Sequence, residues 1–152
     1  PRFYFTRESH GWLGRFDGIG FSTVNAAIDR KVWERVPFGW APMMEDKKWQ
    51  RAAIEAGYRI EARPDAAVLH THDYDWRSLV RRCQSEGFGW QLMGERYGGL
   101  DVVRDLTQLW VYAELARGLV NGRARRPAEI CFPWLRPLAL WWGNHFLDDV
   151  RH

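Results

Sequence analysis

The sequence predicts an α/β fold over residues 1–90 and a helical extension over residues 91–152. In the first part, short β-prone segments alternate with helical ones, and Gly or Pro separates them. Beyond Gly99 the apolar residues recur at helical spacing instead. A chain of 152 residues that is 46% hydrophobic is long and apolar enough to bury one sizeable core.

The elements of the first part follow from local signals. Apolar residues at helical spacing predict a helix over residues 44–56, and Gly57 provides its stop. Asp75 is a candidate N-cap for a helix that ends near Glu86, before Gly87. A shorter helix is expected over residues 26–35. The β-prone segments predict strands over residues 2–5, 21–25, 58–62 and 66–72.

The second part is predicted to be helical throughout. An apolar stripe at helical spacing indicates one long helix, with its members at Val103, Leu106, Trp110, Ala113, Ala116 and Val120. A basic break follows over residues 121–127. Residues 133–150 then form a last, aromatic-rich helical segment.

The composition of the sequence excludes some classes of protein function. Lys and Arg number 22 against 19 Asp and Glu, so the net charge of +3 is too small to indicate a nucleic-acid partner. Cys83 and Cys131 form no C-x-x-C motif, and we expect reduced thiols in a cytoplasmic compartment. No apolar run reaches the roughly 18 residues of a membrane span. The chain opens at Pro1, as a fragment or a processed product does.

Two carboxylates, Glu45 and Asp46, open the predicted helix over residues 44–56. The helix dipole stabilises a carboxylate in the first turn in its charged form, so such a group readily accepts a hydroxyl proton. Ordinary charge complementarity at a helix N-terminus explains the same pair. Adjacent helical positions do not face each other, which disfavours a glycosidase with two opposed carboxyl groups.

Two imidazoles stand at alternate positions of a predicted strand, at His70 and His72. Side chains at i and i+2 of a strand share one face, so both are candidate metal ligands. Together with Asp73 they would also suit a metal-dependent hydrolase, which stays an alternative. The D-x-D sequence at residues 73–75 carries less weight, because Asp75 is already explained as a helix N-cap.

A basic segment precedes aromatic residues near the C-terminus. The residues concerned are Arg117, Arg123, Arg125 and Arg126, followed by Trp134, Trp141 and Trp142. This pattern indicates either a solvated loop beside core aromatics or peripheral contact with an anionic membrane through residues 117–145. A non-catalytic binding or membrane-associating module is therefore a second alternative.

The order of the motifs is more specific than any one of them. In chain order they are Phe21-Ser22-Thr23-Val24-Asn25-Ala26-Ala27-Ile28, Pro37-Phe38, Glu45-Asp46-Lys47, Gly57-Tyr58-Arg59-Ile60, Pro64-Asp65-Ala66 and Val68-Leu69-His70-Thr71-His72. This series resembles the second half of family 2 glycosyltransferases, above all the rhamnosyltransferase-like and galactofuranosyltransferase-like members. The resemblance covers about residues 18–90.

The resemblance implies a partial GT-A fold and an inverting transfer from a nucleotide-diphosphate sugar to a glycan or lipid-linked acceptor, as in cell-wall or polysaccharide biosynthesis. By the same resemblance, Asp46 is the catalytic base with Glu45 beside it, and Asn25 and Trp40 lie near the bound sugars. His70, with His72 as a second candidate, would ligate a divalent cation, Mg²⁺ or Mn²⁺. We expect a cytoplasmic location, with candidate peripheral contact at the inner face of the cell membrane.

Two features depart from the family pattern. The N-terminal nucleotide-binding half, with a D-x-D motif before these elements, is absent from the 152 residues, so we expect no transfer by this chain alone. Asp29 stands where the family often has Arg, and the role of that position stays open.

Overall fold

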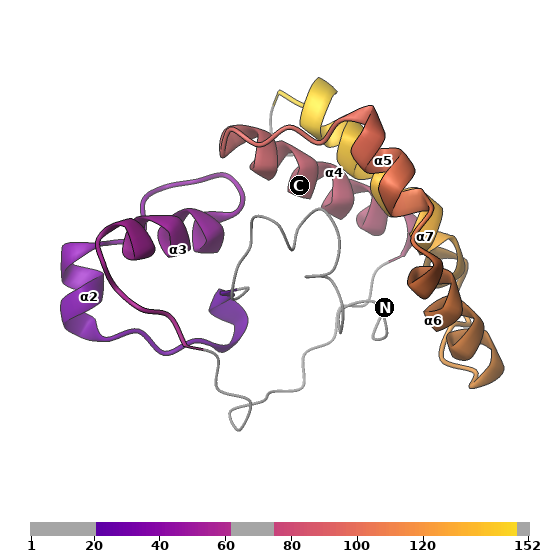
Figure 1. Ribbon diagram of the computed structural model, residues 1–152, viewed down its shortest axis with the longest axis horizontal. Coiled ribbons are helices and arrows are strands. Elements are labelled where there is room, and N and C mark those ends of the chain that lie inside the picture. Colours follow the sequence, from indigo (N-terminus) through magenta and orange to yellow (C-terminus); the bar gives the residue numbers. More distant parts are fainter. Residues whose placement is uncertain (1–20, 62–74, 149–152) are drawn as a thin grey trace.

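The computed structural model describes residues 21–61 and 75–148, and within these ranges the chain forms helices and no strand (Figure 1). In chain order the elements are the 3₁₀ helix η2 (Thr23–Asn25), α2 (Arg30–Arg35), α3 (Glu45–Glu55), α4 (Trp76–Leu92), α5 (Gly99–Leu106), α6 (Leu109–Val120) and α7 (Pro127–Phe146). The prediction of an α/β, partial GT-A fold is therefore wrong: the described structure is all-helical.

The physical reason is visible at Phe21, where a strand was expected. A strand needs a neighbouring strand to satisfy its backbone groups. Here side chains of α3 take that place: the Phe21 amide donates to Gln50 Oε1 at 3.0 Å, and Lys47 Nζ donates to the Phe21 carbonyl at 2.7 Å. The chain then turns into η2, with Ser22 as its N-cap.

The segment after α3 also forms no strand in its described part. Residues 58–61 have no regular structure, although Tyr58 and Ile60 pack against a core cluster of Phe21, Trp49 and Ala53. The predicted strands over residues 2–5 and 66–72 lie outside the described residues.

Helix α3 forms where the sequence predicts it. Trp49, Gln50 and Ala53 lie on its buried face. Gly57 ends the helix with a φ of 85°, as expected for a C′ glycine. The amides of Gly57 and Tyr58 donate to the carbonyls of Ile54 and Ala53, which satisfies two otherwise orphaned helix-end acceptors.

Helix α2 is shorter than the predicted helix over residues 26–35. It begins at Arg30 because Asp29 is its N-cap, with the side chain accepting the Lys31 amide proton at 2.7 Å. Asp29, whose role was open from the sequence, therefore has a structural function in the described protein.

Helix α4 begins as predicted but continues past its predicted end. Asp75 caps it by accepting the Ser78 amide at 2.7 Å, and the Ser78 hydroxyl and amide both lower the pKa of this carboxyl. The helix continues through Gly87 and ends at Leu92, followed by Gly94 at a φ of 81°. Gly87 instead allows close helix packing, because a Cβ there would lie 2.0 Å from the Leu140 carbonyl oxygen.

The long helix predicted over residues 103–120 is divided into α5 and α6. At the division, the Thr107 hydroxyl donates to the carbonyls of Val103 and Arg104, and such local bonds compete with helix continuation. The Tyr112 hydroxyl then donates to the Leu106 carbonyl at 2.6 Å. The apolar stripe expected on the long helix is largely turned to solvent, since Val103 is 57% and Val120 86% exposed.

Helix α7 begins earlier than predicted, with Pro127 as its first residue. Glu129 accepts the amides of Arg125 and Arg126. Burial raises the pKa of Glu129, but these two backbone bonds and the charge of Arg126 together outweigh it, and the net pKa is lowered. Pro133 and Pro137 lie inside the helix and are buried.

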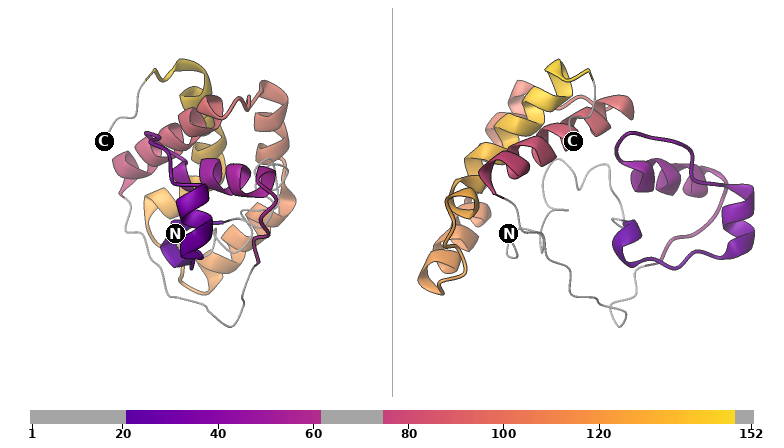
Figure 2. Two further views of the ribbon diagram at one scale, coloured as in Figure 1. Left: turned by 90° about the vertical axis from the view of Figure 1, so that its left-hand side faces the viewer. Right: turned by 180° about the vertical axis from the view of Figure 1, so that it is seen from behind.

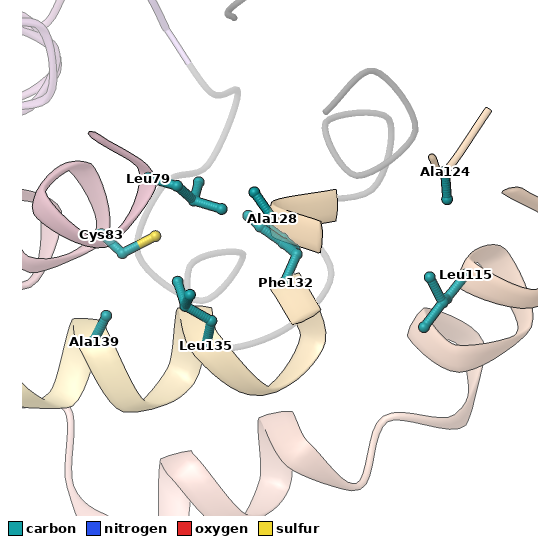
Figure 3. Packing of buried hydrophobic residues seen from close by; sticks show 8 residues of the cluster. All are labelled: Leu79, Cys83, Leu115, Ala124, Ala128, Phe132, Leu135 and Ala139. Carbon is teal, nitrogen blue, oxygen red and sulfur yellow. The ribbon is translucent and has the colours of Figure 1, made fainter. Parts of the chain in front are cut away.

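Helices α4 and α7 lie along each other, with α5 and α6 against α7 (Figure 2). One core cluster fills the space between α4, α6 and α7, made of Leu79, Cys83, Leu115, Ala124, Ala128, Phe132, Leu135 and Ala139 (Figure 3). The division predicted between residues 90 and 91 falls within α4 and stays a prediction.

Arg51 connects α3 to the segment after α4. Its guanidinium donates to the Met93 carbonyl at 3.2 Å and pairs with Glu95 at 2.7 Å. Met44, just before α3, packs against Trp90, Tyr97 and Leu140. Through these contacts α3 and the residue before it meet the C-terminal end of α4 and the segment that follows it.

Candidate active site at the start of helix α3

Asp46 lies in the first turn of α3 and is half-buried. Its Oδ1 accepts the Lys47 amide proton at 2.8 Å. The helix dipole and this backbone bond both favour the charged carboxylate, which is the form that accepts a proton. Glu45 precedes it and is exposed. The structure therefore fixes the orientation of Asp46 and leaves Glu45 in solvent.

The segment that contains Asn25 is bound to the same helix. Lys47 and Gln50 together bond both backbone groups of Phe21, which precedes the N-cap residue of η2. Asn25 is the last residue of η2 and is exposed. Two segments that the sequence marks as candidate site regions therefore meet on α3.

Trp40 is attached to α3 by its backbone. Its carbonyl accepts from Lys48 Nζ at 3.5 Å, while its side chain is 85% exposed. An exposed indole ring offers a flat apolar face with a polar edge, which suits stacking against a sugar ring. Trp40, Asp46 and Phe21 are thus all connected to the first two turns of one helix.

An aromatic group under α3 fixes this arrangement. Trp49 stacks on Phe38 with ring centroids 5.2 Å apart and contacts Phe21 at 4.9 Å. The Trp49 indole N–H donates to the Val36 carbonyl at 2.6 Å. Burial of these large rings makes the base of the candidate site rigid.

Met44 has an unusual backbone conformation directly before the two acids. Its φ of 62° and ψ of 30° lie in the left-handed region, the only positive φ of a non-glycine residue in the described chain. Such a conformation costs about 1 kcal/mol or more and is common beside functional sites. The turn at Met44 sets the direction in which α3 and its first carboxylates leave the preceding loop.

The predicted metal site is not built by the described residues. His70, His72 and Asp73 lie outside them. Within residues 21–61 and 75–148, no group of three or more His, Cys, Asp and Glu side chains is arranged to ligate a metal ion. A divalent-cation site at His70 and His72 therefore stays a prediction.

The sequence did not indicate the roles of Lys47, Lys48 and Gln50. These residues carry the connections from α3 to Phe21 and Trp40. For Lys47 and Gln50 the available signal was their spacing, because residues three apart on a helix lie on one face.

Comparison with known proteins adds no relative: no family model, no curated protein sequence and no solved structure matches the chain. The geometry of the site and the order of its motifs are therefore the basis of the functional argument.

Proposed function

We propose that the chain is the acceptor-side part of an inverting glycosyltransferase, in which Asp46 is the general base. The donor is a nucleotide-diphosphate sugar and the acceptor a glycan or a lipid-linked sugar. The observation that carries the proposal is the convergence on α3: an oriented carboxylate lies in its first turn, and Phe21 and the exposed Trp40 are both hydrogen-bonded to its side chains.

Inverting glycosyl transfer requires one carboxylate on the acceptor side. An acceptor hydroxyl must lose its proton as it attacks the anomeric carbon, and a positioned carboxylate accepts that proton. We assign this step to Asp46, whose carboxylate the Lys47 amide orients in the first turn of α3. The exposed ring of Trp40 gives the acceptor sugar a surface on which to stack, which aligns the hydroxyl with the base.

The donor side needs groups that the described residues do not supply. The diphosphate leaving group develops negative charge, which a cation or positioned donors must neutralise. We therefore propose that the 152 residues are inactive without a nucleotide-binding half. Titration of nucleotide-diphosphate sugars into the chain with Mn²⁺ should give no saturable binding at micromolar concentrations. Tight donor binding or turnover by the chain alone would contradict this part of the proposal.

The test of the base uses the enzyme in which these residues work beside a donor-binding half. Asp46→Asn keeps the size of the side chain but removes its basicity, so kcat should fall by about 10²-fold or more while donor binding is kept. Asp75→Asn is the matched control, because Asn also caps helices well and Asp75 caps α4. Equal rates for wild type and Asp46→Asn would exclude Asp46 as the base.

A further inference from the structure

The outer face of α7 is apolar along its length. Four side chains at a spacing of four residues are each between 44% and 55% exposed, namely Trp134, Leu138, Trp142 and Phe146. They run along about 18 Å of helix, since each helical residue rises 1.5 Å. We call these four residues the α7 ridge. No charged side chain interrupts it, because Arg136 is turned inward and pairs with Glu86 at 2.8 Å.

Contacts between rings, rather than burial, define the positions of the aromatic side chains in the α7 ridge. At its far end Trp142 contacts Phe146 with centroids 4.9 Å apart, and Trp141 meets Phe146 edge-on at 5.4 Å. At its near end Trp134 contacts Tyr112 of α6 at 5.7 Å. Leu138 lies between the two aromatic groups. The exposed rings therefore have defined positions relative to one another.

Helix α6 also carries exposed apolar side chains. Leu109 is 82% exposed and Val120 86%, and the exposed positions between them include Ala113 and Ala116. The contact of Tyr112 with Trp134 joins the two helices beside these residues. An apolar area of this kind on a folded domain indicates a surface that binds something.

The exposed charges around the loop between α6 and α7 are basic, whereas Asp148, beyond the far end of the ridge, is exposed and acidic. Between residues 109 and 147, every charged residue that is exposed is an arginine: Arg117, Arg123, Arg125 and Arg126. The two acids of this stretch are partly buried: Glu114 pairs with Arg117 within α6, and Glu129 bonds the backbone at the start of α7. A partner must therefore be apolar along the ridge and negatively charged beside the loop between α6 and α7.

We propose that α6 and α7 bind peripherally to an anionic lipid surface, with the α7 ridge inserted at the level of the headgroups and the exposed arginines of the loop between α6 and α7 on lipid phosphates. Trp and Phe favour this interfacial layer, and guanidinium groups bond phosphate in a bidentate way. No helix of the described residues is long and apolar enough to cross a bilayer. The proposal goes beyond the transferase proposal and does not depend on it, because lipid binding is measured without any donor or turnover.

The experiment is co-sedimentation of the complete chain with vesicles of phosphatidylcholine alone or with added phosphatidylglycerol. Wild type should bind the anionic vesicles and release them at high salt. Trp142→Ala should weaken the partition constant about tenfold or more, because a half-exposed indole no longer enters the interface. Arg123→Gln with Arg125→Gln should weaken it roughly 30-fold on anionic vesicles.

Two variants control for folding and for nonspecific stickiness. Trp33→Ala removes a Trp of matched exposure, 48% against 50%, from α2, which lies away from the ridge, and should leave lipid binding unchanged. Trp142→Phe should restore most of the binding lost in Trp142→Ala. Circular dichroism should show unchanged helix content and thermal midpoint for each variant.

The outcomes separate a lipid partner from a second copy of the chain. Sedimentation velocity without lipid should give the same size for wild type and Trp142→Ala. A wild-type oligomer that Trp142→Ala dissociates, with equal lipid binding by both, would overturn the proposal in favour of self-association. Equal binding to neutral and anionic vesicles, or equal loss in Trp33→Ala, would overturn it as well.

Discussion

Gly143 of α7 lies directly against the backbone of Gln84 in α4: a Cβ at position 143 would be 1.9 Å from the Gln84 carbonyl oxygen. Backbone atoms cannot rotate away as a side chain can, so the two helices would have to separate. Gly143→Ala should therefore lower the free energy of unfolding by about 3 kcal/mol. Urea unfolding followed by circular dichroism measures this change.

Gly99→Ala is the matched control for that prediction. Gly99 opens α5, and a Cβ there has no heavy atom within 4 Å. Alanine at this site should leave stability unchanged or raise it slightly, because Gly loses more backbone entropy than Ala on folding. Equal stability of Gly143→Ala and wild type would mean that α4 and α7 are farther apart than the structure places them.

Asn144, next to Gly143, should be a second residue on which this packing depends. Its Nδ2 donates to the Gly87 and Glu95 carbonyls at 2.9 and 3.0 Å, and its Oδ1 accepts the Tyr97 amide at 2.9 Å. Asn144→Ala leaves three backbone groups without this partner in a site only 3% exposed. The expected loss is about 3 kcal/mol, measured by urea unfolding.

Asn121→Ala tests whether loss of any asparagine has this effect. Asn121 is exposed at the end of α6, and its truncation should change stability by less than about 0.5 kcal/mol. Similar losses in both variants would contradict a special role of Asn144.

These sites show where sequence reasoning succeeded and where it failed. The start of α4 at Asp75 and the stop of α3 at Gly57 depend on neighbours in sequence, and both were predicted correctly. The role predicted for Gly87 was wrong. A glycine that ends a helix and a glycine that allows close helix packing cannot be distinguished in the sequence until the partner helix α7 is known. The division of α5 from α6 was missed for a related reason: it depends on side-chain bonds around Thr107.

For the candidate site, too, one prediction from the sequence was correct and another was wrong. The sequence predicted that Asp46 opens a helix, and α3 confirms that position. It also predicted a strand at Phe21, where side chains from α3 bond the backbone instead. Which partner satisfies a backbone group is a tertiary property, so periodicity alone could not decide it.

Because of Tyr97, the free energy of unfolding of the protein should fall at alkaline pH. Burial raises the pKa of its phenol, and the bond to the Asp105 carboxylate at 2.7 Å raises it further. Below the ordinary value of 10.0 the phenol is neutral in both the folded and the unfolded chain, so its contribution is complete. Above that pH the unfolded chain loses the proton first, and stability falls as pH rises.

Tyr97→Phe isolates this effect. At neutral pH the variant should be less stable by about 2 kcal/mol, because the Asp105 carboxylate loses a donor. The difference from wild type should shrink above about pH 10, by up to about 1.4 kcal/mol per pH unit. Urea unfolding at a series of alkaline pH values measures it, and a difference that stays constant with pH would contradict the raised pKa.

Gln50 should keep the Phe21–Asn25 segment on α3. Its side chain is only 5% exposed, and its Oε1 accepts the Phe21 amide proton at 3.0 Å. Gln50→Leu keeps the volume but removes the acceptor, so the Phe21 amide should exchange with solvent about tenfold faster or more, in line with loss of a bond worth about 1.4 kcal/mol. Amides in α4 and α7 should keep their protection, because these helices pack on each other away from Gln50. Gln91→Leu, at an exposed position in α4, is the control and should leave the Phe21 amide unchanged. Hydrogen exchange read by NMR resolves the single amide.

Two outcomes would contradict this role of Gln50. Unchanged exchange at Phe21 in Gln50→Leu would show that Lys47 alone holds the segment. Faster exchange throughout α4 and α7 would show that Gln50 supports the whole fold rather than the site.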